Sequence, residues 1–167
     1  NSVTDNGDDG IRNYGGKDNT VSLNTVHRNW AAGVHTHSGS NIRIRDLDLA
    51  DNNRSANSAA GVAFETDSTI LIDGSYINTT AAFIAEILNL QIVNTDDITT
   101  VSKNGIEIGA DIGSITDAAA IISIDNIGFL NQDYSITNKA DLTNINLSIG
   151  DCKFINSSQT NIRNLAI

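Results

Sequence analysis

With 167 residues, 40% of them hydrophobic and only 5% aromatic, the chain can form one domain whose core is built mainly from Ile, Val, Leu and Ala. Twenty acidic against ten basic side chains give a net charge of −10, which argues against nucleic acid and anionic membranes as partners. No run of 18 apolar residues occurs, so the sequence predicts no membrane insertion.

Short strands separated by polar turns follow one another along the chain, and residues 31–52 contain the unit that is repeated. Side chains alternate along a strand, so the first strand of this unit predicts Val34 and Thr36 inward and His35 and His37 outward. The next strand has arginines at its outward positions, Arg43 and Arg45. No segment has the helical period, and the absence of proline suits a chain made of strands.

Two columns of equivalent positions recur every 21 to 31 residues, and together they indicate about six coils. The first column precedes an inward aliphatic residue at Gly10, Gly33, Gly61, Phe83, Gly105 and Ser135. Those aliphatic residues, expected to stack as an inner ladder, are Ile11, Val34, Val62, Ile84, Ile106 and Ile136. The second column is the last inward residue before the closing turn: Val26, Leu49, Ile77, Ile98, Phe129 and Phe154. The pattern predicts an all-β parallel β-helix, with residues 1–167 forming one domain.

The closing turns and the two ends of the chain complete this picture. Asparagines recur at the turns, where stacked amides are expected to bond to one another: Asn29, Asn52, Asn78, Asn131 and Asn156. Cys152, in phase with Phe154, is expected to point into the core. The chain opens in mid-pattern and residues 161–167 resemble one more strand. We therefore expect a piece of a longer protein, or ends that pack on other chains.

The spacing of Asn, Val and Ala-Gly-Val between Asn19 and Val34 resembles the right-handed parallel β-helix repeat of the pectin-lyase-like superfamily. That group includes polysaccharide lyases, polygalacturonases, alginate epimerases and phage tailspikes, and the resemblance is clearest over residues 5–78. Gly7-Asp8-Asp9-Gly10-Ile11 is similar to the paired-aspartate strand of polygalacturonases, and Gly33-Val34-His35 to their Gly-His-Gly. The chain departs from the polygalacturonase pattern in one respect, because no Arg-Ile-Lys strand follows on the third coil. The resemblance implies long polysaccharides as partners.

Stacking the coils brings candidate chemical groups together on the outer face of the opening strands. Two outward columns are predicted: Arg12, His35, Ala63, Ala85 and Glu107, and Tyr14, His37, Glu65 and Ile87. Neighbouring coils are separated by about 4.8 Å. Arg12 should therefore lie beside His35, Tyr14 beside His37, and His37 beside Glu65, with Asp8 and Asp9 just upstream.

This cluster has the groups that chemistry on a uronic acid requires. Arg12 could neutralise the sugar carboxylate, with Arg43 or Arg45 as weaker candidates. A base near neutral pH removes the C5 proton, which suits His35 or His37. Tyr14 could return a proton to the leaving oxygen, and similar Tyr, His and Arg sets occur in alginate lyases and epimerases. Asp8, Asp9 and Glu65 complete the candidate site.

Other interpretations of the same residues stay open. Outward side chains of a β-helix are expected to be solvated, so the cluster could be ordinary polar surface. His35 and His37 with Glu65 could bind zinc, and Asp8 and Asp9 could form a loose calcium site, although the sequence assigns no metal or cofactor. Trp30, the only tryptophan, is either a sugar-stacking platform or a cover over a coil edge.

Together these features lead to one prediction and one alternative. The prediction is an extracellular, cell-surface or virion protein that engages an acidic polysaccharide and cleaves or epimerises it as a lyase, epimerase or hydrolase. The alternative is a non-catalytic fibre, adhesin or filament subunit. Outward Ala63, Ala85, Ile87 and Gly109 would suit a face covered by another chain, and tailspikes typically associate as trimers, so a homo-oligomer is expected by that resemblance.

Overall fold

A computed structural model describes residues 1–14, 18–38, 41–52, 68–72, 84–93, 104–109, 120–132, 134–140, 145–156 and 161–164. These residues form fifteen strands in two sheets, and all the strand pairs are parallel. The nine strands of sheet A are β1 (Ser2–Thr4), β3 (Asn19–Ser22), β4 (Thr25–His27), β6 (Asn41–Arg45), β7 (Asp48–Ala50), β9 (Ile84–Val93), β11 (Ala120–Leu130), β13 (Ile145–Ile149) and β14 (Lys153–Ile155). The six strands of sheet B are β2 (Ile11–Tyr14), β5 (Val34–Ser38), β8 (Ser68–Ile72), β10 (Asn104–Ile108), β12 (Tyr134–Asn138) and β15 (Ile162–Asn164).

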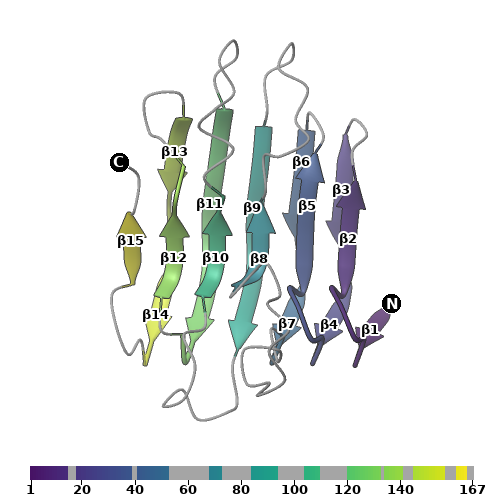
Figure 1. Ribbon diagram of the computed structural model, residues 1–167. Helices are drawn as coiled ribbons and strands as arrows, with labels where there is room; N and C mark the ends of the chain where they lie inside the picture. The colour runs from purple at the N-terminus through teal and green to yellow at the C-terminus, as the bar shows by residue number, and fades with distance from the viewer. Residues whose placement is uncertain are drawn as a thin grey trace.

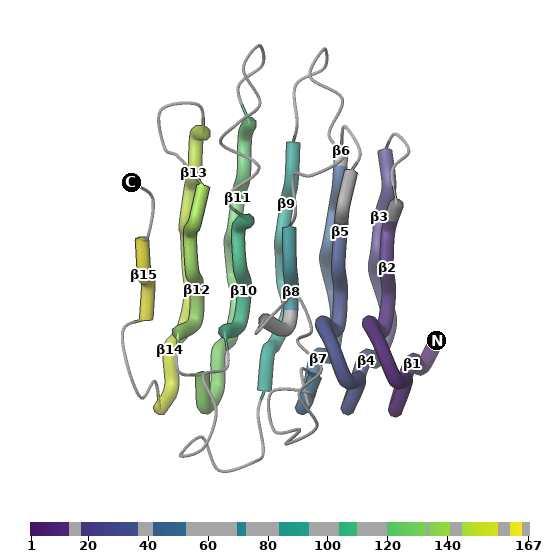
Figure 2. Tube along the Cα trace, in the orientation of Figure 1, coloured from purple at the N-terminus to yellow at the C-terminus, as the bar shows by residue number. Residues whose placement is uncertain are grey.

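The chain winds as a parallel β-helix, because it passes from one sheet to the other and returns one level further along. Sheet B has the order β15-β12-β10-β8-β5-β2, and in Figure 1 it lies in front of sheet A with the two chain ends at opposite ends of the stack. Figure 2 shows the tight turns that join β1 to β2 and β4 to β5 at one edge of the sheets. None of the described segments forms a helix long and apolar enough to cross a membrane.

The core lies between the sheets as vertical columns of aliphatic side chains. One column, from sheet B, is Ile11, Val34, Ile70, Ile106, Ile136 and Ile162. Another, from sheet A, is Val3, Val26, Leu49, Ile92, Phe129 and Phe154. The rings of Phe129 and Phe154 stack with centroids 5.4 Å apart, and Cys152 packs half-buried against the same core as expected. Because like side chains stack on like side chains, the core is filled with few aromatic residues.

The six expected levels exist, and the predicted neighbours Ile106–Ile136 and Phe129–Phe154 are confirmed, but the residues assigned to the third and fourth levels of sheet B are wrong. Ile70 occupies the position assigned to Val62, and Ile84 belongs to sheet A, where it pairs with Asn41 and Ile121. Successive positions Val34, Ile70 and Ile106 are 36 residues apart, which exceeds the assumed period. β15 supplies the sixth level. Val62, Gly61, Phe83, Ile77 and Ile98 lie outside the described residues.

A ladder of buried amides closes the first coils. The Asn29 amide nitrogen Nδ2 donates to Asn52 Oδ1 at 2.8 Å, and Asn52 Nδ2 donates to the Val26 carbonyl at 2.7 Å. The stacking prediction is thus confirmed for this pair, and Asn78 is outside the described residues. Asn131 and Asn156 also bond to each other, at 3.2 Å, but they are exposed and lie one position earlier in the turn than predicted.

The recurring glycine at the start of the sheet B strands follows from close packing, at Gly10 against this ladder and at Gly105 against Ser135 and Phe129. A Cβ atom on Gly10 would lie 2.6 Å from Asn29 Nδ2 and 2.6 Å from Val26 Cγ1, closer than real contacts allow. Gly105 is similar, with a Cβ position 2.6 Å from the Ser135 carbonyl oxygen. Glycine at these places lets the strand start directly against the turn below it.

Two further columns consist of residues with a left-handed backbone, and the first of them bends sheet A at four levels. The first column lies between β3 and β4, between β6 and β7, and within β9 and β11. Its φ angles are between 53° and 55°, at Leu23, Asp46, Asn89 and Asn126. The second column follows the ends of β1, β4, β7, β11 and β14, and its φ angles are between 52° and 57°, at Asp5, Arg28, Asp51, Asn131 and Asn156. Asn and Asp tolerate this conformation because their short side chains bond locally, whereas other residues are strained there.

Leu23 is the misfit of the first column, since its side chain is 76% exposed and gains little from packing. We expect Leu23→Asn to raise the free energy of unfolding by about 1 kcal/mol, because the strain of a left-handed L-residue is relieved. Urea unfolding measures the change. The matched control is Ile121→Asn, a 44% exposed strand residue with no such strain, which should not stabilise. Equal effects of both changes would contradict the explanation.

Candidate functional site

The carboxylate of Asp9 is the centre of the predicted cluster. Its Oδ2 accepts hydrogen bonds from Arg12 Nε at 2.5 Å and from His35 Nδ1 at 2.8 Å. Its Oδ1 accepts one from the Ala32 backbone N–H at 2.9 Å. Asp9 and Arg12 come from the first coil, whereas Ala32 and His35 come from the second, so one carboxylate links two levels of the helix.

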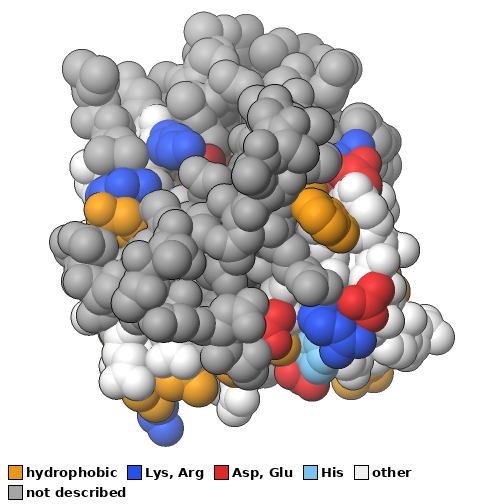
Figure 3. Space-filling model, turned by 60° about the horizontal axis from the view of Figure 1, so that its bottom comes forward, with side chains coloured by type: hydrophobic (Ala, Val, Ile, Leu, Met, Phe, Trp, Pro, Cys, Tyr) orange, Lys and Arg blue, Asp and Glu red, His pale blue; other side chains and the backbone are white. Residues whose placement is uncertain are grey.

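The predicted neighbourhood of Arg12 and His35 is confirmed, because these residues are partners in the register of β2 and β5. Arg12 also contacts Asp8, with its terminal nitrogen 2.8 Å from Oδ1, so its charge lies against two carboxylates. Figure 3 shows side chains of opposite charge lying next to each other over the N-terminal coils. Arg12 is therefore engaged by protein groups where a sugar carboxylate was expected.

The expectation that outward residues are solvated is wrong for most of sheet B. The side chains of Asp9 and His35 are each 2% exposed, although Asp8 is 59% exposed. Further along the same outer column, Leu71 and Glu107 are also buried. Ala85 and Ile87, assigned to outward columns, are instead buried in the core of sheet A. They therefore do not mark a face covered by another chain.

Burial by itself would raise the pKa of the Asp9 carboxyl. The hydrogen bonds from His35 and Arg12, together with their charges, outweigh this effect and lower the pKa below its ordinary value of 3.8. Asp9 is accordingly ionised at neutral pH and holds the proton of His35 on Nδ1, the atom that donates to it.

Several predicted members of the site are not brought into this cluster by the described structure. Glu65 lies outside the described residues, as do the side chains of Tyr14 and His37. The backbone partner of Tyr14 is Ser38, because the register shifts between Asn13 and Tyr14, so Tyr14 does not pair with His37 as predicted.

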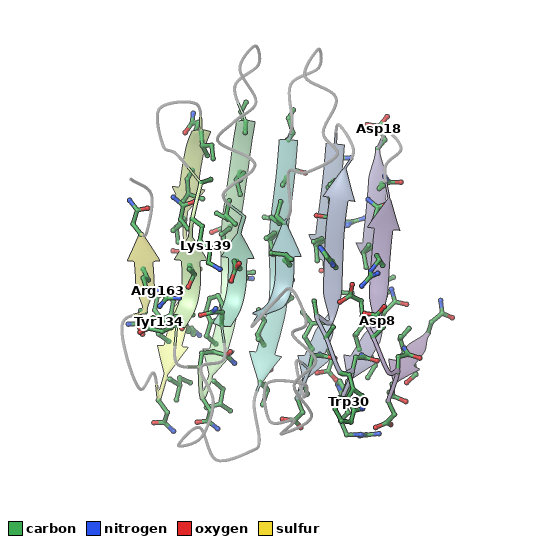
Figure 4. All side chains as sticks on the ribbon, in the orientation of Figure 1. Asp8, Asp18, Trp30, Tyr134, Lys139 and Arg163 are labelled. Carbon is green, nitrogen blue, oxygen red and sulfur yellow. The ribbon has the colours of Figure 1, made fainter. Side chains whose placement is uncertain are left out.

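The other predicted binding residues lie elsewhere on the molecule. Arg43 and Arg45 are on the outer face of sheet A, where Arg43 Nε lies 2.7 Å from Glu86 Oε2 and Arg45 lies near Asp46. Trp30 precedes β5 at the turn, 40% exposed, and its backbone N–H donates to the Asn6 carbonyl. Figure 4 shows Trp30 at the same end of the first coils as Asp8.

A second polar cluster lies two levels beyond His35 in the same outer column. Lys139 Nζ lies 2.7 Å from Glu107 Oε1, and Asn104 Nδ2 donates to Glu107 Oε2 at 3.3 Å. The Thr137 hydroxyl donates to Asn104 Oδ1 at 3.2 Å. Glu107 was predicted in this column, but its partners were missed because the column was not continued to the next level. The predicted pairing of Ile106 with Ile136 already places Thr137 beside Glu107.

The last level of sheet B ends in an aromatic–cation pair. The guanidinium carbon of Arg163 lies 3.6 Å from the centre of the Tyr134 ring, and both side chains are half-buried. Figure 4 shows the pair together at the C-terminal end, with Lys139 nearby on the same side. Among the described residues no carboxylate forms an ion pair with Arg163.

The metal alternatives find no arranged ligand set in the described part of the chain, where no three His, Cys, Asp or Glu side chains are grouped to hold an ion. Asp8 and Asp9, the calcium candidates, both contact Arg12. The zinc set depended on Glu65 and the His37 side chain, which are outside the described residues.

A family model for the right-handed β-helix region matches residues 1–115. The chain belongs to the right-handed β-helix family. No curated protein and no solved structure matches it. Membership supports a β-helix of the polysaccharide-engaging or structural kind, and the superfamily resemblance noted from Asn19 to Val34 agrees with that fold.

The lowered pKa of Asp9 predicts how this β-helix responds to acid. A carboxylate with a folded-state pKa below its unfolded value stabilises the fold fully above the unfolded value. That contribution is lost as the pH falls through the folded pKa. We expect Asp9→Asn to destabilise by about 3 kcal/mol near neutral pH, because it breaks a buried ion pair. The difference from the parent should shrink below about pH 4.

Urea unfolding of both proteins across this pH range measures the effect. Asp8→Asn is the matched control, because that exposed carboxylate meets the same arginine in water and should cost less than about 1 kcal/mol. A difference between parent and Asp9→Asn that stays constant down to the lowest pH would refute the assignment.

Proposed function

We propose that this right-handed β-helix binds an acidic polysaccharide at the C-terminal end of sheet B, where Tyr134 of β12 and Arg163 of β15 are half-buried. The observation that carries the proposal is the stacking of Arg163 on Tyr134, which places a guanidinium group over one face of an aromatic ring. Guanidinium groups suit carboxylates in bidentate contacts, and aromatic rings suit the apolar faces of sugars.

The distribution of charge supports this choice of ligand and of end. Arg12, Arg28, Arg43 and Lys139 each have a carboxylate within 3.0 Å among the described residues. Arg163 instead lies over Tyr134, and no carboxylate of the described residues pairs with it. In a chain of net charge −10, a guanidinium that pairs with none of the described carboxylates is where a polyanion is expected to experience less repulsion.

Cleavage or epimerisation at Asp9 and His35 is the second candidate. Asp9 holds His35 through the hydrogen bond at Nδ1, and a histidine oriented by a carboxylate in this way can act as a general base. However, both side chains are 2% exposed, and Asp9 already binds Arg12 and Ala32. These contacts favour a role in joining the first two coils, so we rank catalysis below polysaccharide binding as a candidate function.

A purely structural role as a rigid element is the third candidate, and it is favoured by the continuous columns of stacked residues. It requires no ligand. It therefore predicts no polysaccharide binding in the experiment that follows.

Arg163→Gln should weaken binding of polygalacturonate about tenfold, because one charge-assisted contact is lost. Affinity electrophoresis or calorimetry at low salt measures this, and added salt should weaken the parent's binding further. Arg43→Gln is the matched control, since Arg43 is an exposed arginine on the opposite sheet. Equal losses in both variants would contradict a specific site. No binding by the parent would favour the structural role.

The catalytic candidate is tested by the absorbance of unsaturated uronides released from polygalacturonate or alginate. We expect the parent and His35→Ala to give the same background signal, because His35 is buried. Product formation by the parent that disappears in His35→Ala, with the β-sheet circular dichroism unchanged, would overturn the non-catalytic form of the proposal.

A further inference from the structure

A hollow of about 320 Å³ lies on the outer surface of sheet A, on the opposite side of the molecule from Asp9 and Arg163. It follows the left-handed bend at Asn89 and Asn126, across β9, β11 and β14. Exposed polar side chains form its rim: Asn89, Gln91, Asn126 and Lys153. The buried aliphatic residues beneath it are Leu47, Leu90 and Ile127.

The hollow exists because one position lacks a side chain. Along its column, the register aligns Asp48, Gln91, Gly128 and Lys153 on successive levels. Gly128 is therefore a gap between the long side chains of Gln91 and Lys153. A Cβ atom built on Gly128 would meet only Gln91 Cγ, at an ordinary 3.5 Å, so the strand itself does not require glycine here.

The rim has the chemistry of a sugar site. Asn126 Nδ2 donates to Asn89 Oδ1 at 2.9 Å, which fixes both amides at the left-handed bend and leaves Asn126 Oδ1 and Asn89 Nδ2 for a ligand's hydroxyl groups. Lys153 contributes an ammonium group, and the described lining residues include no carboxylate. A volume near the lower limit of ligand sites, about 300 Å³, suits one sugar unit rather than a long chain.

We propose that this hollow is a second carbohydrate site that holds a single uronate unit. The rim amides bond to the hydroxyl groups, Lys153 pairs with the carboxylate, and the aliphatic floor meets the apolar face of the ring. The choice of a uronate rests on the proposed acidic polysaccharide, whereas the location rests on the hollow alone. A polymer could then contact two faces of one molecule.

The experiment compares galacturonate with galactose, which differ only at the carboxylate. Side-chain amide signals of Asn89, Gln91 and Asn126 are followed by NMR during titration, with the Arg163 side-chain signal as a reporter of sheet B. We expect galacturonate to shift the amide signals with at least fivefold higher affinity than galactose. Gly128→Leu should abolish these shifts by filling the hollow.

Lys153→Gln is the matched variant that keeps the shape of the rim. It should reduce galacturonate affinity to that of galactose and leave galactose binding unchanged, because only the ammonium–carboxylate contact is lost. The proposal is overturned if Gly128→Leu binds galacturonate like the parent, or if both sugars bind alike in the parent. Amide shifts without any change at Arg163 would support this hollow and count against the site on sheet B.

Discussion

The whole structure depends on parallel register between successive coils. Each paired residue lies on a residue of the next level, about 4.8 Å distant, and in the core the two are of similar character. This condition is met in the core by aliphatic columns, at the turns by the amides of Asn29 and Asn52, and at the bends by residues with a left-handed backbone. A side chain that suits one level is therefore close to suitable at the next, which is why a short repeat specifies the fold.

The same register explains the two kinds of polar contact on sheet B. Where an acidic and a basic side chain fall on adjacent levels, as with Asp9 and His35 or Glu107 and Lys139, they contact each other and the carboxylate of each pair is buried. Where a cation falls beside an aromatic ring, as with Arg163 and Tyr134, it stacks on that ring instead. The kind of contact that a polar side chain makes thus depends on the residue at the neighbouring level.

Much of this architecture could be predicted from the sequence, because alternation and recurring Gly-aliphatic pairs encode strands and levels. The first two coils were placed correctly, and Arg12 meets His35 as expected. The third level was misplaced, since a 36-residue interval contains Gly61-Val62, which imitates the start of a strand. Burial of His35 was also missed. Alternation tells which face a side chain occupies, but not whether that face is covered.

The bends of sheet A have a consequence for how such a chain can change its length. Asp46 and Asn89 are equivalent although 43 residues separate them, whereas Leu23 and Asp46 are only 23 apart. The paired segments on the two sides of the bend, residues 41–50 and 84–93, have equal length, so the additional residues lie outside them. One residue inserted between a bend and the end of its strand would instead exchange the core and solvent faces. Residues can therefore be added at the connections between strands. The number of residues between a bend and the end of its strand is constrained, because side chains alternate between the core and solvent faces.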